Sequence, residues 1–328
     1  MSWSITELTK WSGADFIFHS GPKMSIVSVM IRSVFTLLGA TLLLAGSRVT
    51  AQQADQALAG HLNAVYQHWR HAMMTKNYRN WQLHTATHRR TSIVNRIHSE
   101  RRRIASTLFN LPAAPPDTRS LKLLDVKVKG LTANLIYFGP VDFGVGGRPP
   151  KNLLVLSFVR EAEGWKYDTA DYLNLASLPE VRTQLEAGQL DHLKKPEFLP
   201  AGSVEEPLVV LRAPVKYIAK TYVYCPGREV RVMVNGMSRH LYQNTKESEV
   251  IIGGARDGRN EVQFTASKLP GGQGTEPMTI RVYLMSQMAG VKPIKMFQYQ
   301  VLENGAVKPS GTEYFEVGPA EARRLRGQ

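Results

Sequence analysis

Histidines are the first residues in this sequence that could do chemistry. Six of the nine lie between His61 and His98, and His84 and His88 stand four residues apart. On a helix this spacing puts both imidazole rings on one face, where they could bind one metal ion. A tight zinc site needs three or four ligands, yet no Asp or Glu lies between Gln56 and Ser99, and an H-E-x-x-H motif is absent. We therefore expect no metal site and no cofactor.

A basic cluster is the second candidate. Residues 52–103 hold nine Lys and Arg against two acidic residues. Guanidinium groups bind anions through paired hydrogen bonds, so this segment could be an anion-binding helix face; the alternative is a solvated face without a ligand. The anion-binding candidates are Arg89, Arg90, Arg102 and Arg103. Arg101 falls beside an apolar helix stripe and is expected to point inward, toward an acid or a pocket.

The glycine-rich loops and the cysteine indicate neither a nucleotide site nor a nucleophile. Gly144–Gly147 is followed by Arg148-Pro149-Pro150, so no helix can begin there to hold a pyrophosphate, and we predict a hairpin loop. The one cysteine, Cys225, has no marked histidine partner and is predicted to be a buried thiol. A single cysteine also excludes an intrachain disulfide framework.

The N-terminus resembles an export signal. Arg32 precedes an apolar run from Val34 to Ala45, which is shorter than the about 20 residues that a membrane-spanning helix needs. Val49-Thr50-Ala51 is typical of a cleavage site. We expect cleavage after Ala51 and a periplasmic or secreted protein; an uncleaved anchor is the alternative. The segment before the apolar run is long for a signal peptide, so the true start could be Met1, Met24 or Met30.

The elements that position these residues follow from hydrophobic periodicity. A helical period places Leu58, Leu62, Val65, Trp69 and Met73 on one face, and further helices are predicted over 77–88 and 92–109. The period then changes to two. Strands are predicted over 121–128, 131–138, 152–159 and 164–170, with a helix from residue 179 to 185.

The C-terminal part reads almost entirely as strands and turns. Seven strands are predicted, over 215–224, 229–235, 248–252, 260–266, 278–285, 295–303 and 314–317. This spacing favours a β-sandwich. The predicted organisation is an N-terminal extension with the signal over 1–51, an α+β domain over 52–193, a proline-rich linker over 194–207, a sandwich over 208–320 and a basic tail over 321–328.

Both domains resemble known folds. The helix with Val65–Trp69, the Lys76-Asn77-Tyr78 segment and the strand Gly164-Trp165-Lys166-Tyr167 resemble the NTF2-like superfamily, whose strands often carry G-x-W-[KR]. The second domain resembles immunoglobulin-like or jelly-roll modules, on the segment Gly258–Val262. The whole plan is similar to two-domain secreted proteins of bacteria. The resemblance implies a cone-shaped α+β fold whose helices pack on a curved antiparallel sheet.

The NTF2-like resemblance also implies a pocket between helix and sheet, which some members use for acid–base chemistry. The pocket candidates in this sequence are His84, Arg101, Tyr137, Asp142 and Asp168. No pair of them has a diagnostic spacing, so we assign no catalytic residue.

Three functions remain open. The first is a non-enzymatic binding or scaffold protein of the bacterial cell envelope, and the second is an isomerase or lyase that uses the cone. The third is glycan binding by the sandwich, through exposed aromatics such as Tyr217, Tyr222, Tyr242 and Tyr283. Expected partners are an envelope protein, an acidic glycan or an anionic lipid surface. We expect no nucleic acid, because half of the +14 net charge lies in the one basic segment of an exported chain.

Overall fold

The computed structural model describes residues 44–141 and 149–328. These residues form an α+β protein with three antiparallel four-stranded sheets, as expected at this level of detail. The chain divides into two compact units. The first comprises the residues through Ala86 together with Leu111–Val204, and the second comprises Thr87–Asn110 together with Glu205–Gln328.

The first unit begins with two helices. Helix α1 (Leu44–Met74) buries Leu62, Val65 and Met73, so the predicted apolar face is confirmed. Helix α2 (Tyr78–His84) is capped by the Asn77 side chain, which accepts a hydrogen bond from the backbone N–H of Asn80. It ends before the predicted residue 88, because Thr85 is extended and pairs with Tyr167 of the sheet.

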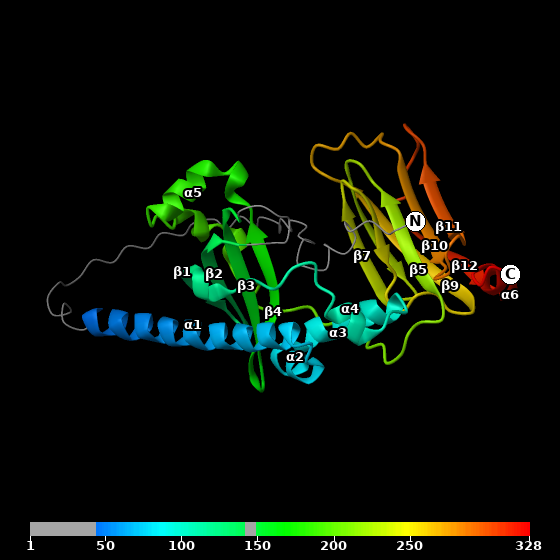
Figure 1. Ribbon diagram of the computed structural model, residues 1–328. Helices are drawn as coiled ribbons and strands as arrows, with labels where there is room; N and C mark the ends of the chain where they lie inside the picture. The colour runs from blue at the N-terminus through cyan, green and yellow to red at the C-terminus, as the bar shows by residue number, and fades with distance from the viewer. Residues whose placement is uncertain (1–43, 142–148) are drawn as a thin grey trace. The chain divides into compact units, whose positions relative to one another are not determined.

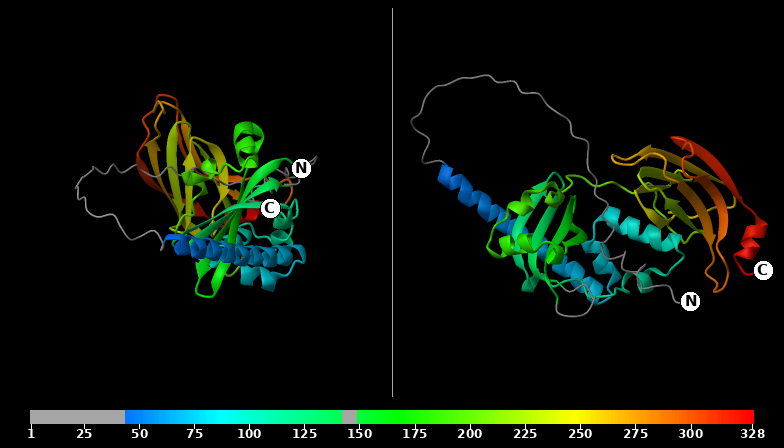
Figure 2. Two further views of the ribbon diagram at one scale, coloured as in Figure 1. Left: turned by 90° about the vertical axis from the view of Figure 1, so that its left-hand side faces the viewer. Right: turned by 90° about the horizontal axis from the view of Figure 1, so that it is seen from above.

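A four-stranded sheet forms the centre of the first unit. Its strands lie in chain order: β1 (Lys122–Lys129), β2 (Thr132–Pro140), β3 (Lys151–Glu161) and β4 (Gly164–Leu173). Helix α1 covers one face of the sheet, and helix α5 (Pro179–Glu186) covers the other (Figures 1 and 2). The sheet is therefore a middle layer with two covered faces.

Strand alternation divides the interior of this unit into two cores. Leu135 and Tyr137 of β2 pack on the α1 side, whereas Ile136 and Phe138 pack on the α5 side. Phe198 joins the second core at 3% exposure. The first part of the expected linker over 194–207 therefore packs onto the sheet, because Phe198 supplies the apolar group that covers it.

Two sheets build most of the second unit (Figure 1). Their strand orders are β11-β10-β5-β8 and β12-β9-β6-β7, and buried residues from both form one core. The strands are β5 (Ile218–Tyr224), β6 (Arg228–Val234), β7 (Ser238–Gln243), β8 (Lys246–Val250), β9 (Gly258–Lys268), β10 (Met278–Met285), β11 (Ile294–Val301) and β12 (Ser310–Val317). This packing of two sheets is sandwich-like, in agreement with the predicted architecture at a coarse level.

The structure contains a strand, β7, and a short C-terminal helix that the sequence did not predict. Residues 238–243 lack a β-branched residue, and their inward positions carry Ser238, His240 and Tyr242, so the sequence pattern missed a strand. The expected basic tail over 321–328 contains most of helix α6 (Pro319–Arg324). Ala322 packs against the core of the unit, which orders this segment.

Two further helices belong to the second unit rather than to the expected α+β domain over 52–193. These are α3 (Thr87–Ser99) and α4 (Ile104–Leu108). The buried Asn95 side chain of α3 donates to the carbonyl of Val209 at 2.7 Å and accepts from the N–H of Leu211 at 2.8 Å. The predicted single helix over 92–109 is interrupted because Arg101 has a φ of 53°.

The expected signal segment and the loop Gly144–Gly147 are not tested by this structure. Residues 1–43 and 142–148 lie outside the described residues. Within the described residues, no helix combines the length and the apolar character that a membrane span requires.

Candidate functional site

Aromatic side chains occupy the space between α1 and the first sheet. The Trp69 and Tyr167 ring centroids lie 4.1 Å apart, and those of Phe158 and Tyr167 lie 6.0 Å apart. Tyr66 and Phe158 are fully buried. The region expected to hold a pocket is therefore a packed aromatic core.

Tyr137 lies within this core. Its hydroxyl donates to Oδ1 of Asn63 on α1 at 3.0 Å. Burial raises the pKa of Tyr137 to about 12, so the hydroxyl keeps its proton at neutral pH. It acts as a hydrogen-bond donor that joins β2 to α1.

The other pocket candidates of the first unit have different surroundings. His84, at the end of α2, contacts His68 with ring centroids 5.1 Å apart and the ring planes tilted by 35°. Burial, followed by His68 and Lys166, lowers the pKa of His84 below its ordinary value. Asp168 is the extra residue of a bulge in β4, where the pairing passes from Thr169 to Tyr167. Asp142 lies outside the described residues.

The arginine candidates all belong to the second unit. Arg101 is exposed, and its guanidinium donates to the carbonyl of Lys216 at 3.3 Å. The expected inward orientation is wrong, because the positive φ ends the helix before this residue could continue its apolar stripe. Arg102 pairs with Glu100 at 3.0 Å, and Arg90 donates to Thr87 at 2.8 Å. Arg89 lies on α3 and Arg103 precedes α4, so anion binding by these groups stays a prediction.

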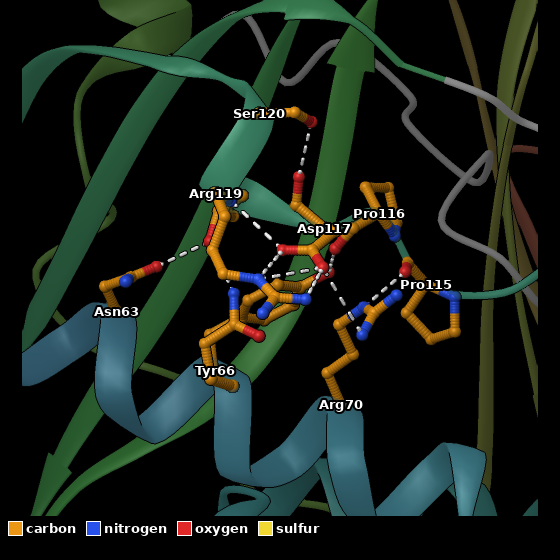
Figure 3. Close-up of polar contacts among 10 residues, drawn as sticks. Asn63, Tyr66, Arg70, Pro115, Pro116, Asp117, Arg119 and Ser120 are labelled. Carbon is orange, nitrogen blue, oxygen red and sulfur yellow. Dashed lines mark hydrogen bonds and ion pairs between the residues drawn. The ribbon is translucent and has the colours of Figure 1, made fainter.

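A polar cluster that the sequence did not reveal joins α1 to residues 115–120 (Figure 3). The Tyr66 hydroxyl donates to the carbonyl of Pro116 at 2.7 Å, and Nε of Arg70 donates to that of Pro115 at 2.8 Å. Asp117 accepts from both the backbone and the guanidinium of Arg119. The clustered donors are directed at backbone carbonyls, which is the arrangement of a structural clamp.

Protonation states in this clamp agree with a structural role. The hydrogen bond from Arg119 is the main cause that holds the pKa of Asp117 well below its usual range. Burial raises the pKa of Tyr66 above its ordinary value. Asp117 thus stays charged and Tyr66 stays protonated at neutral pH, and neither pKa is close to the value that a general base needs.

The second unit contains a shallow hollow of about 280 Å³. Its lining residues come from α3, from residues 205–209 and from the β7 region: Ser92, Asn95, Glu205, Glu206, Pro207, Leu208, Val209, Met237, Arg239 and Ile252. The Asn95 amide is already used on the backbone of residues 209 and 211. Arg239 and Glu205 stand 3.4 Å apart and are largely exposed, so the hollow has little fixed polar chemistry.

The outer face of the β11-β10-β5-β8 sheet has a different composition. We call it the tyrosine face, and its polar and aromatic side chains are Lys220, Tyr222, Tyr224, Lys246, Ser248, Thr279, Arg281, Tyr283, Lys295, Gln298 and Gln300. Ile218, Val250 and Met285 are the apolar residues at outward positions of the same strands. Inward positions on β10, such as Ile280 and Val282, are fully buried, and the outward positions between them are half-buried. The period of two therefore separates this face from the core.

Two tyrosines of this face contact each other. The Tyr222 and Tyr283 rings meet edge to face with centroids 5.1 Å apart. Tyr222 and Tyr224 retain 37% and 40% of their exposure. Large aromatic side chains left on a sheet surface are typical of binding sites.

Two other tyrosines that the sequence nominated as exposed aromatics of the sandwich are buried. Tyr217 is 7% exposed and donates to Asp257, while Tyr242 is fully buried and bonds Thr221. Their expected exposure is wrong, because alternation turns both into the core. The prediction of a buried thiol at Cys225 is confirmed.

Among the residues that the structure describes, no group of three or more His, Cys, Asp or Glu side chains could hold a metal ion. No protein-family model, no curated protein and no solved structure significantly matches the chain.

Proposed function

We propose that this chain is a non-catalytic binding protein of the bacterial cell envelope, and that it binds a glycan on the tyrosine face. The observation that carries the proposal is the contact between the exposed ring of Tyr222 and the half-buried ring of Tyr283 on a sheet face whose side chains are mostly polar. An aromatic ring offers an apolar face to the C–H groups of a sugar ring, and neighbouring polar groups bind its hydroxyls.

The polar groups suited to such hydroxyls lie on β11, the strand next to β10. Gln298 donates to Gln300 at 2.7 Å and accepts from Lys295 at 2.7 Å. These contacts orient the Gln298 and Gln300 amides on the strand next to that of Tyr283. Amides that are already oriented lose less entropy when a ligand binds.

A catalytic cone is the less supported alternative. General acid–base chemistry needs a titratable group in an open pocket, whereas rings such as those of Tyr66 and Phe158 fill the space between α1 and the sheet. For the folds we propose an NTF2-like first unit, with α1 and α2 on an antiparallel sheet, and an immunoglobulin-like or jelly-roll second unit. Export through the N-terminal signal is part of the same proposal.

Affinity electrophoresis of the whole chain in gels containing soluble polysaccharides tests the function. We expect retardation by at least one polysaccharide, and a Tyr222→Ala variant should bind at least about 5-fold more weakly, which corresponds to about 1 kcal/mol of lost contact. Tyr314→Ala is the matched control, because Tyr314 is an exposed tyrosine on β12 of the other sheet. Absence of retardation by every polysaccharide, or equal weakening by both variants, would refute the proposal.

A further inference from the structure

The tyrosine face is basic. Its four strands direct Lys220, Lys246, Arg281 and Lys295 outward, and their outward positions include no Asp or Glu. The acidic residues of the same strands point the other way. Glu249 pairs in register with the buried Thr221 and contacts Nδ1 of His240 at 2.5 Å. Like charges are thus collected on the outer face, where they can attract an anion.

The strand register arranges these groups in rows across the sheet. In one row Tyr222 of β5 stands opposite Arg281 of β10, which stands opposite Gln298 of β11. The next row places Lys220, Tyr283 and Lys295 side by side. Each row therefore combines an aromatic ring with a cation on a neighbouring strand, about 5 Å away.

Arg281 is the central cation of this pattern. It lies on β10, between β5 and β11, and is half-buried. Its Nε atom is buried and has no hydrogen-bond partner among the described residues. A buried donor without a partner costs free energy, which a ligand oxygen would recover. The planar guanidinium also matches the geometry of a carboxylate.

We infer that the ligand of the tyrosine face is an acidic polysaccharide built from uronate units. This inference rests on the proposed function and adds the class of sugar. The rings of Tyr222 and Tyr283 contact the sugar faces, while Arg281, with Lys220 and Lys295 beside it, binds the carboxylates. The repeated pairing of ring and cation fits a polymer in which each unit carries both a sugar ring and a carboxylate.

The test compares polygalacturonate with its fully methyl-esterified form, since esterification removes the negative charge and keeps the sugar backbone. In isothermal titrations of the whole chain we expect polygalacturonate to bind at least 10-fold more tightly, with an affinity that falls as salt is raised. Arg281→Gln should abolish most of this preference. Arg259→Gln is the matched control, because Arg259 lies 3.6 Å over the Tyr314 ring, away from the tyrosine face.

Separate outcomes distinguish the inference from the proposed function. Equal binding of the two polymers, weakened by Tyr222→Ala, would overturn the uronate inference and leave glycan binding in place. The uronate inference would also be overturned if dextran sulfate bound more tightly than polygalacturonate, or if the chain bound only to vesicles of anionic lipid. If the natural chain bound no polysaccharide at all, both the uronate inference and the proposed glycan binding would be refuted. If Arg281→Gln lowers the midpoint of thermal unfolding, Lys220→Gln is used in its place. An unchanged preference for polygalacturonate in Lys220→Gln would refute the role of these cations.

Discussion

Asp117 shows how a single charge fastens a segment to the first unit. Its carboxylate accepts hydrogen bonds from Arg119 and lies 3.8 Å from Nη1 of Arg70 on α1. These groups hold the pKa of Asp117 below that of an unfolded aspartate, which is about 3.9. The stabilisation is therefore present above that unfolded value and is lost as the pH falls toward the lowered folded value.

We predict that Asp117→Asn lowers the free energy of unfolding of the chain at about pH 6. The difference from the natural chain should shrink as the pH falls from about 4 to about 2, because Asp117 of the unfolded natural chain then binds a proton while the folded carboxylate, with its lowered pKa, stays charged. Urea unfolding at a series of pH values measures this difference. A difference that stays constant down to pH 2 would contradict a charge-based role for Asp117.

The contacts between α1 and residues 115–120 could not be predicted from the sequence. Tyr66 and Arg70 meet Pro116 and Pro115 across about 50 positions of the chain. Periodicity identified the buried face of α1, because burial of apolar groups repeats with the helix. It carries no signal for which distant carbonyl a polar side chain contacts, so the clamp could not be predicted.

At the scale of elements, a chain of polar contacts holds β7 to β8. Ser238 stands 2.7 Å from Nε2 of His240, whose Nδ1 contacts Glu249 at 2.5 Å. The Ser238 oxygen also accepts from the N–H of Ile252 at 2.8 Å. Both ring nitrogens of His240 thus have a polar partner in this chain of contacts.

We predict that Ser238→Ala destabilises the protein by about 1–3 kcal/mol, because it leaves buried polar groups on His240 and Ile252 without a partner. Ser310→Ala, at an exposed position on β12, should change stability by less than about 0.5 kcal/mol. Chemical unfolding of both variants measures this. Equal effects would show that the polar chain does not hold β7 in place.

The same strand explains a gap in the predicted elements. A strand is recognised when apolar residues alternate with polar ones, but β7 turns Ser238 and His240 inward. Strand β6, which pairs with β7, and strand β10 of the other sheet carry valine, isoleucine or leucine inward and were predicted correctly. Thus, the sequence predicted the elements whose cores are apolar and missed the one whose core face is polar.

At the scale of the whole molecule, the second unit is discontinuous in sequence. Asn95 of α3 is 2% exposed and bonds the backbone of Val209 and Leu211, more than 100 residues away. Composition and periodicity describe neighbours along the chain. For this reason the sequence assigned α3 to the first domain, and only the long-range contacts place it in the second unit.

We predict that Asn95→Ala lowers the free energy of unfolding by about 2 kcal/mol, because two part-buried backbone groups lose their partner. Hydrogen exchange should then show reduced protection in residues 87–110 and 205–215, with little change in strands β1 to β4. Asn80→Ala, on helix α2 of the first unit, is the control. Loss of protection confined to the first unit would contradict the assignment of α3.

Binding on the tyrosine face is the central claim, and hydroxyl-radical footprinting of the whole chain with polygalacturonate tests it most directly. We predict that the polysaccharide protects Tyr222, Tyr224 and Tyr283 and leaves the exposed Tyr314 of the other sheet unprotected. Protection of Tyr314 or of the exposed Tyr172 of the first unit, with the three face tyrosines unchanged, would contradict it.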